Sequence, residues 1–246
     1  MAQLGLHGII GLAVARAAAP AAGGEAGARR GLCRGLVLGS LLPDTDFFLL
    51  LPAYLIRGGA AVGLHRSWSH SLLAALVAAL LALAAGRRRA GGAGFALGLG
   101  LGMVLHDLTD LLVWFSGVGL LWPADLWGGP WRLHLWSWVR VPRLVSNLLG
   151  AADYMALAGY YLYLEALARR LGTDAAFLPR LRRWAWAAWL LFGVYLILAG
   201  LLAGRGGLFD MAHYGVLILA FLPATLWLTV RMGRTLEALA PGSEAA

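Results

Sequence analysis

Long apolar runs separated by short polar or basic segments dominate the pattern of this chain. Several of the runs approach the ~20 residues that a helix needs to cross a lipid bilayer. The pattern therefore predicts an all-α fold, a polytopic transmembrane helical bundle of about six or seven membrane helices. The expected helices are Leu4–Ala19, Gly35–Tyr54, His70–Gly86, Gly94–Phe115, Ala151–Ala168, Trp184–Gly204 and Met211–Val230.

Short polar segments set the expected boundaries of these helices. Pro20–Arg34 is rich in small residues and arginine, and we expect it to be a linker. Pro43 lies inside the second apolar run and should kink or break it, because proline lacks a backbone donor. Ser69 is a suitable N-cap for the third helix, and the run Arg87-Arg88-Arg89 should end it.

The segment Ser116–Gly150 differs from the apolar runs, because it is dense in tryptophan and arginine. This composition is typical of a segment that lies at the level of the lipid headgroups. We therefore expect residues 1–125 to form one helical region, 126–150 an interfacial segment, 151–234 the C-terminal membrane helices and 235–246 a disordered tail, within one structural domain. The aromatic and basic residues are Trp122, Trp127, Trp131, Trp136, Trp138, Arg132, Arg140 and Arg143.

Composition supports a membrane protein and indicates its orientation. The chain has 246 residues, of which 61% are hydrophobic, and its net charge of +8 comes from arginine without any lysine. Such charge in a membrane protein reports topology and contact with anionic lipids, so membrane lipids are expected partners and nucleic acid is not. Placing Arg87-Arg88-Arg89 in the cytoplasm puts the polar loop Arg57–Ser69 on the outer side. The oligomeric state stays open.

The fourth apolar run carries ionisable residues near its middle, where charges are costly and usually functional. His106 and Asp110 are four residues apart, so on a helix they share one face. Two interpretations are open: the pair grips a metal ion, or it forms a buried hydrogen bond that locks two helices. Asp107 points about 100° away from His106 and suits a supporting or interhelical role.

Further histidine and aspartate residues lie in or beside the other apolar runs. Nitrogen and carboxylate groups of this kind bind zinc, manganese or iron, and a catalytic zinc needs only about three protein ligands. Carboxylates can also bridge, so one or two ions are expected, and a two-metal site suits hydrolysis of a phosphoester. The candidate ligands are His7, Asp44, Asp46, His65, His70, His106 and Asp110.

Alternatives remain for several of these residues. Asp44 and Asp46 cannot share one helical face, so either the backbone breaks there or one of them is not a ligand. His65 by itself is more typical of a loop histidine, whereas His65 and His70 together are more typical of a pair of metal ligands. Arg66 could bind a phosphate through two hydrogen bonds or contact lipid headgroups. Elsewhere, His134 and His213 are expected at the interface, with Asp210 and His213 as a weaker reserve pair.

The order of these motifs resembles the YdjM-like family of bacterial inner-membrane, metal-dependent hydrolases. The resemblance covers about residues 1–125 and implies a bacterial inner-membrane protein whose matching histidine and aspartate residues are metal ligands. Phe47 stands where the family often has histidine, and Ser69 where it often has threonine. The matching motifs are His7, Leu42-Pro43-Asp44-Thr45-Asp46, His65-Arg66-Ser67-Trp68-Ser69-His70-Ser71, His106 with Asp110, and Leu121-Trp122-Pro123.

The leading hypothesis is an integral-membrane hydrolase that cleaves a small-molecule or lipid-linked phosphoester with a water molecule activated by a divalent metal, preferably zinc. Asp44, Asp46 and Arg66 are the candidate catalytic residues, with Arg66 steadying a substrate anion. Two other functions stay open. Intramembrane histidine and aspartate also occur in metal-ion or proton transporters and channels. A closed site would make the metal structural and the protein non-catalytic.

Overall fold

The chain folds into two compact helical units, which we describe separately. The computed structural model describes residues 3–20, 25–48, 52, 65–113, 117–124, 133, 135–136, 138–205 and 207–240. Unit 1 comprises Met1–Ile9 and Arg140–Thr235, and unit 2 comprises Ile10–Val139 and Leu236–Ala246. Helix α1 (Leu4–Ala18) contributes its first turns to unit 1 and the rest to unit 2. This division differs from the domain ranges expected from the sequence.

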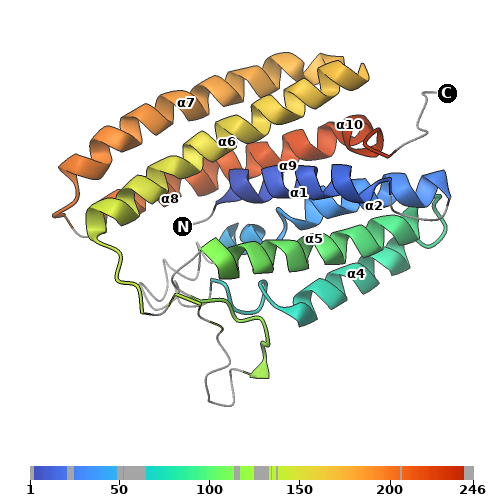
Figure 1. The fold of residues 1–246 in the computed structure, drawn as a ribbon, viewed down its shortest axis with the longest axis horizontal. Coiled ribbons are helices and arrows are strands. Elements are labelled where there is room, and N and C mark those ends of the chain that lie inside the picture. Colours follow the sequence, from blue (N-terminus) through green and yellow to red (C-terminus); the bar gives the residue numbers. More distant parts are fainter. Residues whose placement is uncertain are drawn as a thin grey trace. The chain divides into compact units, whose positions relative to one another are not determined.

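Unit 2 is built around a close pair of helices, α2 (Ala26–Gly39) and α5 (Gly92–Val113), with α4 (Leu72–Gly86) against α5 (Figure 1). Glycines at four-residue spacing let the two backbones of α2 and α5 touch. A Cβ atom at Gly35 would collide with the carbonyl oxygen of Phe95, and one at Gly98 with that of Leu32. Small residues at such spacing are a common way to pack membrane helices.

Two expectations from the sequence are wrong in unit 2. The predicted linker Pro20–Arg34 is wrong from Ala26 onward, because contact with α5 stabilises a helix that its glycines alone disfavour. The N-cap of α4 is Ser71 rather than Ser69: its side chain accepts a hydrogen bond of 3.1 Å from the amide of Ala74. Ser69 is thereby left to bond other side chains.

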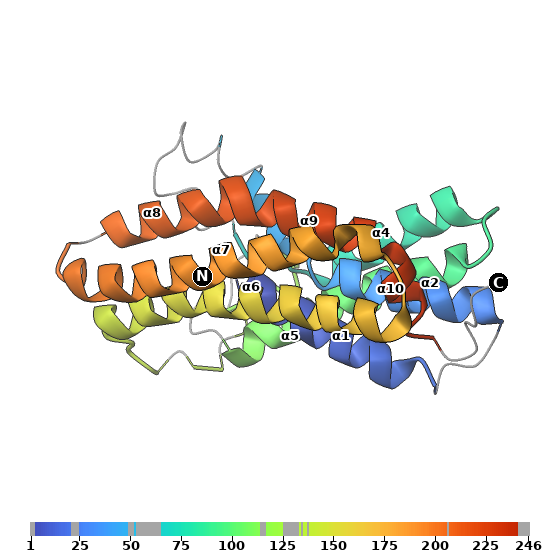
Figure 2. The ribbon, with the colours of Figure 1, turned by 90° about the horizontal axis from the view of Figure 1, so that it is seen from above.

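Unit 1 contains α6 (Arg143–Leu171), α7 (Leu178–Leu201), α8 (Leu208–Val216) and α9 (Leu222–Arg231), with the short 3-10 helix Ala175–Phe177 before α7. A π-helical stretch, Leu217–Phe221, joins α8 to α9, so the two follow one another as a rod in Figure 2. Hydroxyl pairs connect α6 to α9: Tyr160 with Thr229, and Tyr161 with Thr225, each at 2.6 Å. Interhelical hydrogen bonds of this kind stabilise helix packing in membranes.

The helices confirm the predicted all-α membrane bundle. Three stretches in the described part of the chain are long and apolar enough to cross a bilayer: Gly92–Val113, Ala175–Leu201 and Leu208–Arg231. The apolar helices α1 and α4 are shorter. Outside the helices, the described residues include an isolated β-bridge between Val118 and Leu133.

Two boundaries differ from the expected ones. Helix α6 begins at Arg143, inside the segment that was expected to be interfacial. Before this helix, Trp138 is 75% exposed. The tail was expected to be disordered from residue 235, but a short helix α10 (Gly233–Glu237) extends into it and Leu236 is buried. Outside the described residues lie Arg57, Trp127, Trp131, Arg132, His134 and 241–246.

Candidate metal centre

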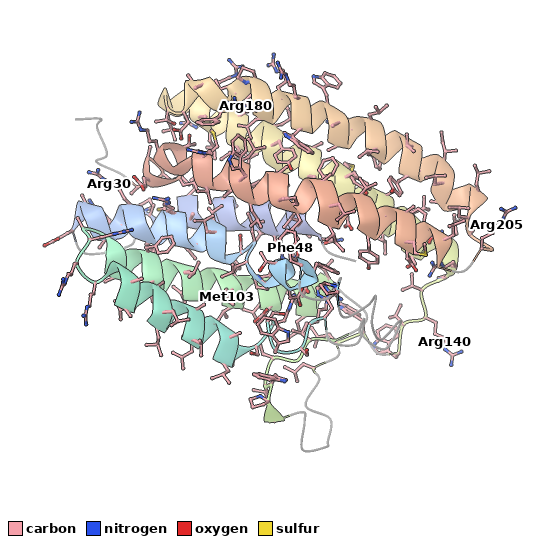
Figure 3. All side chains as sticks on the ribbon, turned by 180° about the vertical axis from the view of Figure 1, so that it is seen from behind. Arg30, Phe48, Met103, Arg140, Arg180 and Arg205 are labelled. Carbon is pink, nitrogen blue, oxygen red and sulfur yellow. The ribbon has the colours of Figure 1, made fainter. Side chains whose placement is uncertain are left out.

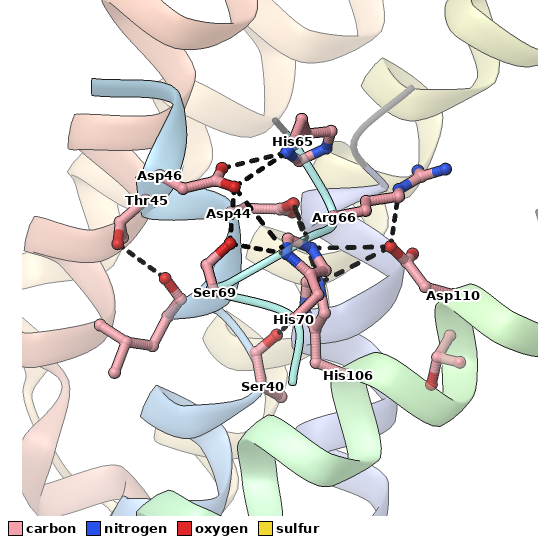
Figure 4. Close-up of polar contacts among 12 residues, drawn as sticks. Ser40, Asp44, Thr45, Asp46, His65, Arg66, Ser69, His70, His106 and Asp110 are labelled. Atoms are coloured by element: carbon pink, nitrogen blue, oxygen red, sulfur yellow. Dashed lines mark hydrogen bonds and ion pairs between the residues drawn. The ribbon is translucent and has the colours of Figure 1, made fainter. Parts of the chain in front are cut away.

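Six of the seven predicted ligands gather in unit 2, on three segments that are far apart in sequence (Figure 4). One segment is η1 (Pro43–Asp46), a 3-10 helix that follows α2. The second is the loop 65–71 before α4, and the third is the C-terminal half of α5. The gathered side chains are Asp44, Asp46, His65, His70, His106 and Asp110.

The end of α2 explains how Asp44 and Asp46 both contribute. With Pro43 at its start, η1 winds with three residues per turn, so side chains two positions apart point about 120° apart. Asp44 approaches His70 and His106, whereas Asp46 approaches His65 and Ser69. The i, i+2 spacing of the two aspartates required either a backbone break or a single ligand, and the helical backbone does break here.

A neighbouring segment holds the loop 65–71 in place. The amide of Gly119 donates to the carbonyl oxygen of Arg66 at 2.8 Å, and the amide of Leu72 donates to that of Leu120 at 3.1 Å. Arg66 has a φ of 62°, in the left-handed region that residues other than glycine rarely adopt. Such strain costs on the order of 1–3 kcal/mol and persists where the surroundings enforce it, often at functional sites.

A hydrogen bond to the main chain fixes the imidazole of His106. Its Nδ1 lies 2.8 Å from the carbonyl oxygen of Ser40, which can only accept, so Nδ1 carries the hydrogen. Ser40 caps the C-terminus of α2, where a carbonyl group is released from the helical ladder. In a neutral His106, the Nε2 atom is therefore unprotonated and carries a lone pair, which is what a metal ligand needs.

The same reasoning applies to His70. The hydroxyl of Ser69 donates to Asp46 Oδ2 at 2.6 Å, so its oxygen accepts from His70 Nδ1 at 2.9 Å. The lone pair of His70 then also lies on Nε2, which is 3.1 Å from Nε2 of His106. Two lone pairs that face each other at this distance repel unless a proton or a cation lies between them.

Two carboxylates complete the cluster around this point. Asp44 Oδ1 lies 3.8 Å from Nε2 of both His70 and His106, and Asp110 Oδ2 lies 3.7 and 3.9 Å from the same two atoms. Ligand atoms of a tetrahedral zinc lie ~2.0 Å from the ion, hence ~3.3 Å from one another. The imidazole pair is close to that spacing and the carboxylates are slightly wider. We call Asp44, His70, His106 and Asp110 the four-ligand cluster; all four are almost fully buried.

Asp46 and His65 form a second, adjoining group. His65 Nδ1 lies 3.0 and 3.1 Å from the two carboxylate oxygens of Asp46, which also accepts from Ser69. Burial lowers the pKa of His65 more than the Asp46 carboxylate raises it. The geometry allows a cation here too, but these hydrogen bonds suit a carboxylate that orients histidines, as in many metal sites.

The charges around His70 act in the opposite direction. Burial disfavours its charged form, yet the nearby carboxylates of Asp44, Asp110 and Asp46 together raise the pKa of His70. The carboxylates thus create a place for positive charge between the two imidazoles. A proton or a metal cation can supply that charge.

Arg66 and His7 are the two remaining predicted site residues. Arg66 is buried, and its Nε forms an ion pair of 2.9 Å with Asp110 Oδ2. Its predicted contact with a substrate anion stays a prediction. His7 is buried on the part of α1 that belongs to unit 1, and its role as a ligand also stays a prediction. Asp107 is buried on α5.

Two features could not be foreseen from the sequence. His213, expected at the interface, is buried in unit 1, where its Nε2 lies 3.1 Å from Asp153 Oδ2. Asp210, its expected partner, instead pairs with Arg143 at 2.6 Å. Ser40 orients His106 through its main-chain carbonyl group. Every residue has such a group, so the sequence gives no sign of this role.

The fold and this site define a class of protein: a helical membrane protein with buried histidine and aspartate side chains that could hold a metal ion. The chain matches the family model described as "YdjM inner membrane protein" over residues 1–206. It therefore belongs to the YdjM inner membrane protein family, and the match extends well beyond the motifs noted in the sequence. Neither the curated proteins nor the solved structures compared with the chain contain a match.

Proposed function

We propose that this protein is a metal-dependent hydrolase of the membrane that cleaves phosphoesters. The observation that carries the proposal is the pair of Nε2 lone pairs, 3.1 Å apart, with two carboxylates beside them. The two imidazoles can face each other in this way when a proton or a metal cation lies between them, and the two carboxylates beside them favour a cation of higher charge. Zinc best matches the nitrogen and carboxylate ligands, and manganese or iron are the alternatives.

The residues of the site would have three different roles: binding the ion, orienting the imidazoles and accepting a proton. Asp44, His70, His106 and Asp110 would hold the ion, which when bound supplies Lewis acidity and a water that is acidic near neutral pH. Asp46 would fix the ring of His65 and, through Ser69, that of His70. His65 keeps its neutral form because burial lowers its pKa, so its Nε2 would be the atom that takes a proton from the attacking water.

Charge explains why a phosphoester is the favoured substrate. Three aspartates surround the site against one buried arginine, Arg66, so the protein groups alone would repel an anion. A bound divalent ion reverses this balance locally, and a phosphate oxygen is the kind of ligand that such ions accept. Binding of the anion would therefore depend on the metal.

Metal analysis followed by an activity screen tests this proposal. Purified protein should contain one or two transition-metal ions per chain and hydrolyse a soluble phosphodiester such as bis(p-nitrophenyl) phosphate, with activity lost to a chelator and restored by zinc or manganese. Protein that is metal-free after gentle purification and takes up neither ion would overturn the proposal. Bound metal with flux across proteoliposomes but without hydrolysis would favour a transporter.

The same proposal places the site on the outer side of the membrane, as the arginine distribution indicates. A Cys33→Ser background with single cysteines at Ser67 or Ala90 tests the orientation. In intact cells, a membrane-impermeant thiol reagent should label position 67 and spare position 90. The reverse pattern would place the site on the cytoplasmic side.

A further inference from the structure

A groove of about 320 Å³ lies directly beside the candidate metal centre, within unit 2. Asp46 and Ser69 form part of its lining, together with Thr45 of η1. From there the lining continues along one face of α4, through Leu73, Val77 and Leu81. The volume is within the range of about 300–1,000 Å³ that is typical of small-molecule sites.

The groove is amphipathic along its length. One end carries a carboxylate and a hydroxyl that already belong to the network around His65 and His70. The rest of the lining is mostly apolar and includes Met103 of α5. Trp68 and Trp122 also line the groove, and indole rings of this kind are enriched at the level of lipid headgroups.

Exposed side chains of α4 line the apolar part of the groove. Leu73, Val77 and Leu81 are 40%, 45% and 67% exposed, and α4 has no charged residue along its whole length. Apolar side chains project from α4 on the side away from α5 (Figure 3). In a protein of the inner membrane, such a surface contacts acyl chains, so a lipid can enter the groove sideways from the bilayer.

We propose that the groove binds the acyl chain of a membrane phospholipid and brings its phosphate to the Asp46 and Ser69 end. This inference rests on the proposed function and names its substrate class: a phosphoester carried by a bilayer lipid. A water-soluble phosphoester would need a polar entrance, whereas this lining suits a ligand with one charged and one long apolar end. Apolar contacts alone hold the acyl chain of the lipid, so the lipid can bind without being hydrolysed.

Photolabelling measures this binding independently of activity. The probe is phosphatidic acid with a diazirine in one acyl chain, added to the full-length protein in phosphatidylcholine nanodiscs. Labelling of Met103 and of the α4 residues in the groove should saturate with probe and be displaced by unlabelled phosphatidic acid. Labelling that rises linearly and is equal on all exposed faces of α4 would overturn the proposal.

A matched pair of variants locates the bound chain. Val77→Phe places a ring in the groove and should lose most of the saturable label. Leu76→Phe adds a ring at a neighbouring position that is 55% exposed and outside the groove, and it should keep the label. The metal content of Val77→Phe should equal that of the wild type. Equal labelling of both variants, or a cross-link from position 77 to a second copy of the chain, would contradict the lipid groove.

The two proposals can fail separately. Saturable labelling without hydrolysis of any phosphoester would leave the lipid groove standing and remove the hydrolase. Metal-dependent hydrolysis of the soluble diester, without saturable labelling, would leave the hydrolase and remove the lipid groove.

Discussion

Each of the two units contains a buried group of histidine and aspartate, and the two groups differ in their surroundings. In unit 1, His213 and Asp153 form a closed pair of 3.1 Å. Aromatic rings surround it: Phe209 stacks on the imidazole, while Tyr154 and Tyr195 meet it edge-on. In unit 2, several such residues converge from three segments, and neighbouring polar groups hold the imidazoles.

The difference lies in the groups that the ring nitrogens of these histidines face. His213 directs its Nε2 atom at the carboxylate of Asp153, and this contact joins α6 to α8. His106 and His70 direct their Nδ1 atoms at Ser40 and Ser69, and their Nε2 atoms at each other. The single pair in unit 1 thus joins two helices, whereas the converging histidines of unit 2, held by outer partners, form a candidate ligand set.

The largest expected effect is that of Asp44→Asn on turnover. The change removes the charge of a ligand but keeps its shape, so the fold should persist while hydrolysis falls by more than ~100-fold, beyond what loss of a supporting contact usually costs. The matched control in unit 1 is Asp153→Asn, which should leave the turnover per folded molecule unchanged. Equal activity of Asp44→Asn and the wild type would remove Asp44 from the site.

Metal content gives the next comparison. His106→Ala should lower the bound metal strongly, because one of the two facing imidazoles is lost. His213→Ala should keep the metal but destabilise unit 1 by about 3 kcal/mol, since the buried contact between His213 and Asp153 is lost. Elemental analysis and thermal unfolding of both variants separate the two outcomes; if His213→Ala also lost its metal, the distinction between the two groups would be wrong.

Some of this comparison could be predicted from the sequence and some could not. The i, i+4 spacing of His106 and Asp110 placed both on one face of a helix, and the structure confirms it with a distance of 3.9 Å. Such local spacing fixes the direction of side chains whatever the rest of the fold does. Apolar length likewise predicted α5, α7 and the α8–α9 rod.

Long-range contacts were outside the reach of the pattern. The polar, glycine-rich start of α2 has the composition of a linker. It is helical because the glycines of α5 pack against it, and this contact is not visible in the sequence. The carbonyl group of Ser40 gives no sign in sequence that it will face His106. His213 differs from an interfacial histidine only through Asp153, which is sixty residues away in the chain and close only after folding.

A supporting contact should have a smaller effect than a ligand. Ser69→Ala removes the hydroxyl that joins Asp46 to His70, so metal affinity should fall by about 10–100-fold while some metal still binds. Ser69→Thr keeps the hydroxyl and should retain most of the affinity. Competition with a fluorescent zinc chelator measures both. Equal affinities for the alanine variant and the wild type would show that His70 needs no such support.

The smallest effect expected is a dependence of metal affinity on pH. In the metal-free protein the pKa of His70 is raised, since the surrounding carboxylates outweigh the cost of burial, so a proton occupies the place that the metal needs. Affinity should be full above that raised pKa and fall as the pH decreases through it, by about tenfold per pH unit for the single proton displaced. His65 should add nothing over the same interval, because its pKa is lowered. Zinc titrations from about pH 8 to about pH 5.5 should therefore show a decline that begins above the ordinary histidine pKa of 6.5. The closed pair in unit 1 offers no such competition, so His213→Gln should leave the profile unchanged, and a flat wild-type profile would mean that no proton is held between His70 and His106.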